Sequence, residues 1–219
     1  MNSPRRAALF DLDRTLVRVD TARLYVRYQR QIGEADFVDM LRVSWWALLY
    51  TFNMIDAPRV AVKALAQFKG TPEVVIAARC DDWYRKFVEP HVSDAARTTV
   101  RRHREAGDLC AIVTGASPYA ARPLARALGI EHALATQLEV VDGAFTGMPI
   151  FPLCFGEGKV QLTRTLLDEH GIDMQDATFY SDSVTDLPLL SAVGTAVAVN
   201  PDPRLRRQAT RRGWRIEKW

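Results

Sequence analysis

The chain contains 219 residues, of which 48% are hydrophobic and 25% are charged, and its formal net charge is +3. This is the composition of an ordinary globular protein, and so small a positive charge does not indicate a nucleic-acid partner. The three widely spaced cysteines, Cys80, Cys110 and Cys154, exclude a disulfide framework and a cysteine-based zinc site.

The sequence also indicates where the protein is expected to work. A first strand near Arg5 leaves no room for a signal peptide, and the cysteines fit a reduced, cytoplasmic compartment. The longest apolar run, from Val43 to Ile55, is shorter than the ~20 residues that span a bilayer. We therefore expect no stable membrane insertion, with peripheral association left open. The sequence does not indicate an oligomeric state.

In chain order, the first predicted element is a buried strand at residues 7–10. Asp20 and Thr21 then predict the start of a helix that ends near Gln31, before Gly33. Further helices are predicted at residues 35–52, 56–70 and 71–89 from their apolar spacing and their Gly and Pro residues. Four consecutive helices without a strand predict a helical insert at residues 17–91.

From Ser93 onward, predicted helices and strands alternate. We predict strands at residues 109–114, 133–136, 178–181 and 195–199, and a hairpin over 138–146 that turns at Asp142-Gly143. The helices are predicted at residues 93–107, 118–128, 159–170, 187–193 and 203–212. This alternation is typical of the α/β class with a doubly wound parallel sheet.

The order of these elements predicts two domains. Residues 1–16 and 92–219 form the expected α/β core domain, and residues 17–91 form a helical cap domain inserted after the first strand. Because the insert leaves the core next to the carboxyl end of that strand, we expect it to act as a lid over a site there.

Polar residues that could take part in catalysis or ligand binding follow the predicted strands or begin a predicted helix. They are Asp11, Asp13 and Thr15 after the first strand, Thr114 and Gly115 at the end of the strand 109–114, Lys159 at a helix start, and Asp182, Thr185 and Asp186 after the strand 178–181. The carboxyl ends of parallel strands meet at one edge of the sheet, so these groups are expected to share a site.

Each of these features alone has an ordinary explanation as a turn, a surface lysine or a helix cap. Together, however, four carboxylates cannot crowd into one site without a cation. Hard oxygen ligands in this number suit Mg²⁺. A metal ion, a lysine, a hydroxyl and free amides are what a transferring phosphoryl group requires.

The four groups of residues, at Asp11–Thr15, Thr114–Gly115, Lys159 and Asp182–Asp186, form four sequence motifs in chain order. With these motifs, the chain resembles the haloacid dehalogenase superfamily of phosphatases, in particular the branch that holds phosphoserine phosphatase. The resemblance covers essentially the whole chain, and the family's helical cap corresponds to residues 17–91. It implies a Rossmann-like core and a Mg²⁺-dependent phosphomonoester hydrolase that acts on a small phosphorylated metabolite, such as phosphoserine or histidinol phosphate.

The resemblance also implies roles for individual residues. Asp11 is the expected nucleophile, which becomes an aspartyl-phosphate, and Asp13 the acid/base that protonates the leaving oxygen and then activates water. Thr114, Gly115 and Lys159 are expected to bind the phosphoryl group. The expected Mg²⁺ ligands are the Asp11 carboxylate, the main-chain carbonyl of Asp13 and Asp182. The supporting residues are Asp186, Thr15 and Thr185.

Two positions depart from the family pattern. The fourth motif commonly begins with Gly-Asp, where this chain has Ser181-Asp182, and it often has Asn where this chain has Thr185. Because that Asn usually touches phosphate, the change affects one phosphate contact and leaves the expected reaction class intact.

Two features bear on the substrate. Asp20 either recognises a substrate amino group, as an acidic residue near this place does in phosphoserine phosphatases, or only caps a helix. The apolar helix around Trp45 and Trp46 is either buried within the cap or exposed toward a lipid-like substrate, a bilayer or a partner. The second alternative keeps open a phosphatase or phosphotransferase that acts on a lipid-related phosphate at a membrane surface.

Two other classes of protein fit less well. A response-regulator receiver also uses Asp, Thr or Ser and Lys around Mg²⁺, but its phosphorylated Asp follows a middle strand and it has no helical cap. A catalytically inactive binding module is expected to have lost one of Asp11, Asp13, Lys159 or Asp182, and this chain retains all four.

Overall fold

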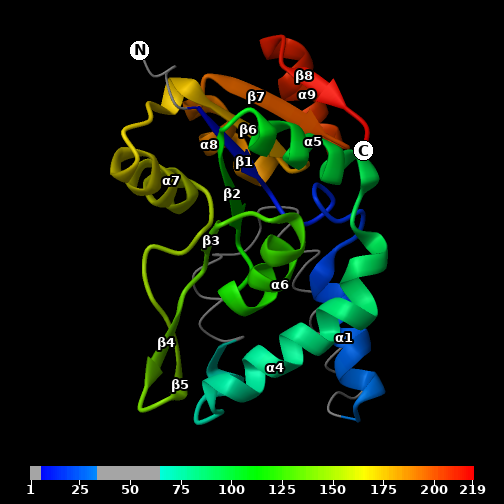
Figure 1. The fold of residues 1–219 in the computed structure, drawn as a ribbon, viewed down its shortest axis with the longest axis vertical. Helices are drawn as coiled ribbons and strands as arrows, with labels where there is room; N and C mark the ends of the chain where they lie inside the picture. The colour runs from blue at the N-terminus through cyan, green and yellow to red at the C-terminus, as the bar shows by residue number, and fades with distance from the viewer. Residues whose placement is uncertain (1–5, 34–64) are drawn as a thin grey trace.

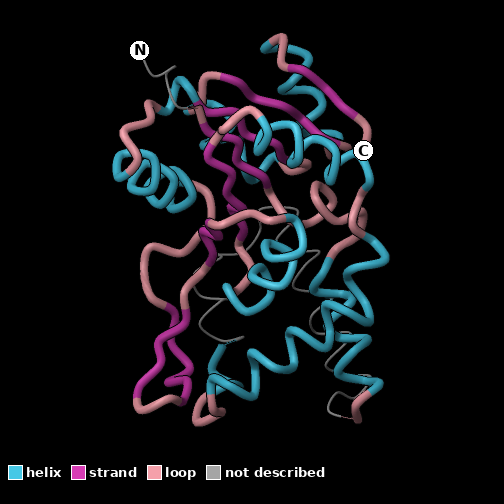
Figure 2. The backbone as a smooth tube through the Cα atoms, viewed as in Figure 1, coloured by secondary structure: helices cyan, strands magenta, loops and turns pink. Residues whose placement is uncertain are grey.

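A six-stranded parallel sheet forms the centre of the protein in this computed structural model, which describes residues 6–33 and 65–219. The strand order is β3-β2-β1-β6-β7-β8, and each neighbouring pair is parallel. Figure 2 shows the strands in magenta and the helices in cyan. The strands are β1 (Ala7–Phe10), β2 (Leu109–Thr114), β3 (His132–Ala135), β6 (Ala177–Ser181), β7 (Thr195–Val199) and β8 (Arg215–Glu217). The predicted α/β class is confirmed.

Two hydrophobic cores cover the two faces of this sheet, because successive side chains of a strand point to opposite faces. In β1, Ala8 and Phe10 belong to one core, and Ala7 and Leu9 belong to the other. The first core includes side chains of α5 (Asp94–Glu105) and α6 (Pro118–Leu128). The second includes side chains of α7 (Glu157–Glu169), α8 (Leu187–Ala192) and α9 (Pro203–Arg212).

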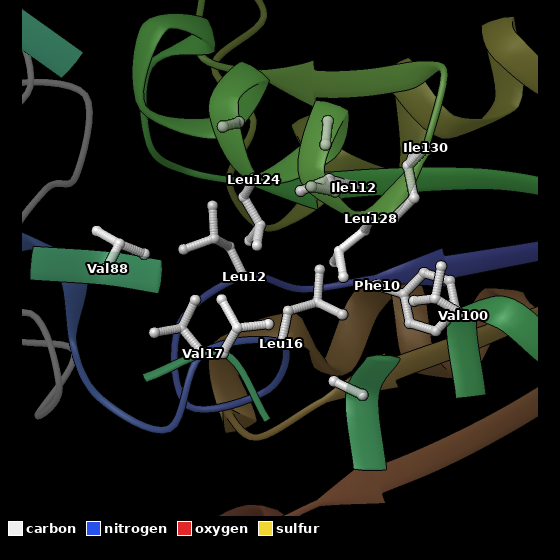
Figure 3. Packing of buried hydrophobic residues seen from close by; sticks show 14 of the residues in the cluster. Phe10, Leu12, Leu16, Val17, Val88, Val100, Ile112, Leu124, Leu128 and Ile130 are labelled. Atoms are coloured by element: carbon white, nitrogen blue, oxygen red, sulfur yellow. The ribbon is translucent and has the colours of Figure 1, made fainter. Parts of the chain in front are cut away.

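The chain leaves and re-enters the core along two adjacent segments after β1. Val17 bridges to Val92, the Ser93 amide donates to the Leu16 carbonyl at 3.0 Å, and the Arg18 amide donates to the His91 carbonyl at 2.9 Å. Figure 3 shows Leu16 and Val17 packed in the first core beside Val88 and Leu124. Both connections of the inserted segment are therefore anchored against the core.

The described part of the insert is helical. It comprises α1 (Thr21–Gln31), the 3₁₀ turn η1 (Ala66–Phe68), α4 (Glu73–Trp83), the π-helical turn η2 (Tyr84–Val88) and the 3₁₀ turn η3 (Glu89–His91). Asp20 caps α1 by accepting from the amides of Ala22 and Arg23. In Figure 1, α1 and α4 lie at the end of the molecule away from β7 and β8. The predicted helix 35–52, with Trp45 and Trp46, lies outside the described residues.

A two-stranded hairpin extends from the core to the insert. β4 (Leu138–Val141) pairs antiparallel with β5 (Ala144–Pro149), and the hairpin turns at Asp142 and Gly143, as predicted. Both turn residues have positive φ, as a type I′ turn requires. The Glu73 amide at the start of α4 donates to the Gly143 carbonyl at 2.8 Å. Figure 1 shows the hairpin next to α4, so an element that follows β3 in the chain contacts the described part of the insert.

The remaining differences from the predicted elements are local. The helical path does not end before Pro90, because this residue sits in the first turn of η3, where its missing N–H is not needed. α7 begins at Glu157, two residues before the predicted Lys159. β8 and the 3₁₀ turns η4 (Met174–Asp176) and η5 (Val184–Asp186) were not predicted. No helix among the described residues is long and apolar enough to cross a membrane.

Candidate active site

The polar residues singled out in the sequence meet at the carboxyl edge of the sheet. Asp11 directly follows β1, where its amide donates to the Tyr180 carbonyl at 2.9 Å. Thr114 is the last residue of β2, Asp182 follows β6, and Lys159 is in the first turn of α7. All four, together with Asp13, line one cavity.

Lys159 connects two of the carboxylates. Its Nζ lies 2.8 Å from Oδ1 of Asp11 and 2.9 Å from Oδ2 of Asp186, and all three side chains are buried. Burial alone would lower the pKa of Lys159, but the charges of Asp11 and Asp186 raise it well above its usual value. The lysine is therefore a permanent cation that holds the two carboxylates in place.

Ser181 supports the same cluster, and sequence reasoning gave it no role. Its hydroxyl donates to Oδ2 of Asp186 at 2.7 Å, and its oxygen accepts from the Ser183 amide at 3.2 Å. Ser181 is fully buried at the end of β6. The residue that departs from the common Gly-Asp pattern thus orients the carboxylate that holds Lys159. The only available signal was that departure itself.

The carboxylates carry more negative charge than Lys159 alone can balance. Burial, followed by repulsion from Asp11 and Asp186, raises the pKa of Asp182 to about 9. Burial also raises the pKa of Asp11 to about 7, although Lys159 opposes this shift. A buried group of carboxylates with raised pKa values favours the binding of a cation, and hard oxygen donors of this kind suit Mg²⁺.

Among residues 6–33 and 65–219, no group of three or more His, Cys, Asp or Glu side chains forms a ready metal cluster. The expected ligand set contains only two side-chain carboxylates, those of Asp11 and Asp182, and its third protein ligand is the main-chain carbonyl of Asp13. The donor types and the uncompensated charge therefore fit a Mg²⁺ ion whose remaining ligands come from water or substrate.

Asp13 is linked to the first helix of the insert. Its Oδ1 accepts a hydrogen bond from the Thr21 amide at 2.6 Å. Burial and the nearby negative charge of Asp20 raise the pKa of Asp13 to about 6, while the hydrogen bond from Thr21 opposes the shift. A carboxyl group with this pKa exchanges its proton near neutral pH, as a general acid/base requires.

The segment after β2 forms an open turn beside the carboxylates. The Ala116 amide donates to the Thr114 hydroxyl oxygen at 3.2 Å. A Cβ added to Gly115 would lie 2.2 Å from the Phe155 ring, so this position has no room for a side chain. Gly115 lines the cavity, so its backbone lies where a phosphate oxygen could approach.

The other predicted residues occupy several different positions. Asp20 and Thr185 line the cavity, and the hydroxyls of Thr185 and Ser183 lie 2.9 Å apart. The Asp20 carboxylate caps α1, as one of its two interpretations requires, so its contact with a substrate stays a prediction. Thr15 is fully buried, lies outside the residues that line the cavity, and its hydroxyl has no hydrogen-bond partner among the described residues.

The cavity has a volume of about 500 Å³ and is bounded by both the core and the insert. The sheet-end loops contribute the carboxylates, Lys159, Thr114 and Gly115, and α1, η1 and α4 contribute side chains from the other side. A phosphate ester bound at the carboxylates would therefore place its alcohol portion against the insert.

Comparisons with known proteins agree with this arrangement. The family model for haloacid dehalogenase-like hydrolases matches residues 8–191. A phosphoserine phosphatase of Mycobacterium tuberculosis is 36% identical over 96% of this chain and 70% of its own length. A histidinol-phosphatase of Neisseria meningitidis serogroup C is 30% identical over 97% of this chain and 98% of its own.

Among solved structures, a protein of unknown function from Bordetella pertussis Tohama I is similar along nearly its whole length. Its TM-score is 0.89 at 36% identity, and the match covers 98% of this chain and 99% of that chain.

Proposed function

This chain belongs to the haloacid dehalogenase-like hydrolases, and from that premise we propose that it hydrolyses phosphomonoesters through a phosphorylated Asp11. The observation that carries the proposal is the buried bridge from Lys159 to Asp11 and Asp186 at the carboxyl edge of the sheet. A lysine in this position keeps the Asp11 carboxylate charged and oriented, which a carboxylate nucleophile requires.

The proposed reaction has two steps. In the first, the Asp11 carboxylate attacks phosphorus, the ester P–O bond breaks, and Asp13 gives its proton to the leaving alcohol. In the second, Asp13 takes a proton from a water molecule that attacks the phosphoryl group on Asp11, and inorganic phosphate leaves. The pKa of Asp13, raised to about 6, supports its roles as proton donor to the alcohol and as proton acceptor from water.

The neighbouring groups bind the phosphoryl oxygens. We assign this role to the Thr114 hydroxyl, the Gly115 amide and the ammonium of Lys159, all of which line the cavity. Asp186 and Ser181 act through Lys159 because they hold it in place. Thr185 and Thr15 have supporting roles in this assignment.

The site residues fit Mg²⁺ as the cofactor. The Asp11 carboxylate, the Asp13 main-chain carbonyl and the Asp182 carboxylate would hold it. When bound, Mg²⁺ supplies positive charge that offsets the carboxylates and the phosphoryl oxygens.

We further propose that residues 17–91 form a cap domain on a core of residues 1–16 and 92–219. The paired connections at residues 16–18 and 91–93 support this division, as does the contribution of α1 and α4 to the cavity. A cap in this place shields the reaction from water and contacts the alcohol portion of the substrate.

The proposed substrate is a small phosphorylated metabolite of the phosphoserine or histidinol phosphate type. The names of the relatives support this class. A phosphotransferase would use the same groups with an alcohol in place of water. A lipid-related phosphate would involve the apolar segment near Trp45, which the sequence predicts to be a helix and which lies outside the described residues.

Phosphate release from a panel of phosphomonoesters, with Mg²⁺ and with a chelator, tests the proposal. We expect Mg²⁺-dependent release that falls by at least about 10³-fold in Asp11→Asn, because an amide is not a nucleophile. The matched control is Asp168→Asn, which changes an exposed aspartate of α7. Substantial release by purified, folded Asp11→Asn protein would refute Asp11 as the nucleophile. Release that occurs only when an acceptor alcohol is added would indicate a phosphotransferase.

A further inference from the structure

Two residues with unusual backbone conformations contact each other at the edge of the site. Among the described residues, the non-glycine residues with positive φ are Arg14 (53°), Asp142 (51°) and Asn200 (44°). The side-chain amide of Asn200 donates to the Arg14 carbonyl at 3.2 Å. Asparagine adopts this conformation readily, whereas arginine does so only at a cost in free energy. The contact therefore helps to hold Arg14 in a strained conformation.

The conformation of Arg14 controls the direction of the Asp13 carbonyl, which we propose as a ligand for Mg²⁺. That carbonyl and the Arg14 amide belong to one planar trans peptide, so they point in opposite directions. The Arg14 amide donates to the Val19 carbonyl at 3.4 Å, and the Arg14 carbonyl is the group that Asn200 holds. Hydrogen bonds thus fix the peptides on both sides of Arg14.

Asn200 is itself anchored beside the edge strand β8. Its backbone amide donates to the Glu217 carbonyl at 2.9 Å, and its side-chain oxygen accepts from the Trp219 amide at 3.0 Å. Because the Trp219 amide can only donate and the Arg14 carbonyl can only accept, these partners determine which way the Asn200 side chain is turned.

Asp202 holds the second loop that carries a proposed metal ligand. It lies two residues after Asn200, in the turn between β7 and α9. Its amide donates to the Asp182 carbonyl at 2.8 Å, and its Oδ2 accepts from the Val184 amide at 2.7 Å. Its Oδ1 caps α9 by accepting from two amides of the first turn. One short turn is therefore bonded to both ligand-bearing loops.

We propose that Asn200 and Asp202 are positioning residues that hold the Asp13 carbonyl and the Asp182 loop in place for Mg²⁺. Neither residue lines the cavity, so both act through the loops that they bind. The inference rests on the proposed function and deepens it. Hydrogen-bond partners of metal ligands typically change metal affinity or activity by about 10- to 100-fold.

Mg²⁺ binding, measured by isothermal titration calorimetry, tests the contact between Asn200 and Arg14. Asn200→Gly removes the side chain but still accepts a positive φ, so the turn can keep its backbone conformation. We expect it to weaken Mg²⁺ binding about 10-fold. Turnover of this variant is expected to recover as the Mg²⁺ concentration is raised, which a general loss of folded protein would not produce.

A second substitution shows whether the effect passes through Arg14. In Arg14→Gly, position 14 adopts a positive φ without strain and no longer depends on Asn200. In that background, Asn200→Gly is expected to weaken Mg²⁺ binding by about twofold or less, because coupled residues are non-additive. Equal weakening in both backgrounds would overturn the proposed role of Asn200.

The matched control for Arg14→Gly is Asp142→Gly, which replaces the remaining non-glycine residue of positive φ in the described chain. Asp142 lies in the hairpin turn and does not line the cavity. Asp142→Gly is expected to leave Mg²⁺ binding unchanged and to leave the effect of Asn200→Gly at its full size. Suppression of that effect by Asp142→Gly would contradict coupling through Arg14.

Asp202→Ser tests the second loop and provides the test if Asn200→Gly does not fold. A serine hydroxyl still caps α9, but it lacks the second carboxylate oxygen that binds the Val184 amide. We expect Mg²⁺ binding to weaken about 10-fold. The control is Asp173→Ser, at an exposed aspartate that accepts from the Gln175 amide and does not line the cavity. Equal Mg²⁺ affinity of Asp202→Ser and Asp173→Ser would overturn the role of Asp202.

The proposed function and this inference fail in different experiments. If the wild-type protein hydrolyses none of a panel of phosphomonoesters, the proposed function fails. Calorimetry needs no turnover, so it still decides whether Asn200 and Asp202 position the metal ligands. Conversely, Mg²⁺-dependent hydrolysis by the wild type, with unchanged Mg²⁺ affinity in Asn200→Gly and Asp202→Ser, would overturn the inference and leave the function intact.

Discussion

The ammonium group of Lys159 lies 2.8 Å from Oδ1 of Asp11, although the two residues are 148 positions apart in the sequence. The contact joins the start of α7 to the end of β1. Both side chains are buried, so each one depends on the other to remain charged away from water. This dependence makes Lys159 a structural as well as a chemical part of the site.

Replacement of Lys159 by Met is therefore expected to affect both stability and activity. Asp11 and Asp186 would lose their buried cation, and we expect the free energy of unfolding to fall by about 3 kcal/mol. Turnover is expected to fall by about 10³-fold or more. Urea unfolding at pH 7.5 and steady-state kinetics measure the two effects. The control is Lys218→Met, at an exposed position, and equal stability of the two variants would contradict the assigned role of Lys159.

The metal-free protein is expected to lose stability as pH rises. Burial raises the pKa of Asp182 from 3.8 to about 9 and that of Asp11 to about 7. A raised carboxyl pKa means that the folded protein binds protons more tightly than the unfolded chain. The resulting stabilisation is complete below pH 3.8 and is lost as pH rises through about 7 and then about 9. Unfolding by urea in the presence of a chelator measures this decline.

The Asp182→Asn variant separates this effect from general pH effects. Without metal at pH 8, it is expected to be more stable than the wild type by roughly 1–2 kcal/mol, because a destabilising charge of the site is removed. Mg²⁺ is expected to stabilise the wild type and to have little effect on the variant. Equal stabilisation of both proteins by Mg²⁺ would remove Asp182 from the proposed ligand set.

Periodicity predicted most of the fold because the buried strands and amphipathic helices leave a clear apolar pattern. β1 and β2 are nearly continuous apolar runs, as expected for strands covered on both faces. β8 was missed because its three residues, Arg215–Glu217, carry no such pattern and lie at the edge of the sheet. The strand forms because its backbone pairs with β7. A pattern of side chains in the sequence does not predict this backbone pairing.

The candidate site was predicted from residue types that recur at strand ends, and the structure adds the contacts among them. Asp186 was expected to support Lys159, and the structure places their charged groups within hydrogen-bond distance. The hydrogen bond from Ser181 to Asp186 was not expected, because serine has many ordinary uses at a strand end. The steric relation of Gly115 to Phe155 was also missed, since the two residues are far apart in the sequence.

The Ser181 hydroxyl is expected to contribute to turnover through Asp186. In Ser181→Ala, Asp186 loses a 2.7 Å hydrogen bond inside the protein, and its hold on Lys159 weakens. We expect kcat to fall roughly 10-fold with a smaller change in KM, as is common for residues that orient a neighbouring active-site group. Steady-state kinetics measure the changes in kcat and in KM separately. The control is Ser191→Ala in α8, where an exposed hydroxyl donates to the Leu187 carbonyl and accepts from Arg212. Similar losses in both variants would argue against positioning by Ser181.

Asp13 is expected to make turnover depend on pH in a way that differs between substrates. An alkyl ester needs a proton on its leaving oxygen, so its kcat is expected to fall as pH rises through the Asp13 pKa, about 6. An aryl phosphate has a better leaving group and is expected to show a shallower decline. The test is to measure kcat for both esters between pH 5 and pH 9 at saturating Mg²⁺.

The matched variant for this prediction is Asp13→Asn. It cannot give a proton, so it is expected to lose more activity on the alkyl ester than on the aryl ester, and its aryl activity should not follow the same pH profile. Parallel pH profiles for the two esters in the wild type would contradict Asp13 as the proton donor.

Gly115 is expected to tolerate no side chain while Phe155 is present. The Cβ of Gly115→Ala would lie 2.2 Å from Cε1 of Phe155, so the ring or the turn after β2 must move. A displacement of about 1 Å at groups that position a phosphoryl group lowers turnover by about 10²-fold. We therefore expect kcat/KM of Gly115→Ala to fall by about this factor, and the double variant Gly115→Ala/Phe155→Ala to recover part of the loss.

Gly158→Ala serves as the contrast, because its Cβ would meet the backbone oxygen of Leu153, an obstacle that Phe155→Ala does not remove. Losses from Gly115→Ala and Phe155→Ala that simply add would show that the ring does not limit the space at Gly115, because a shared steric contact makes two substitutions non-additive.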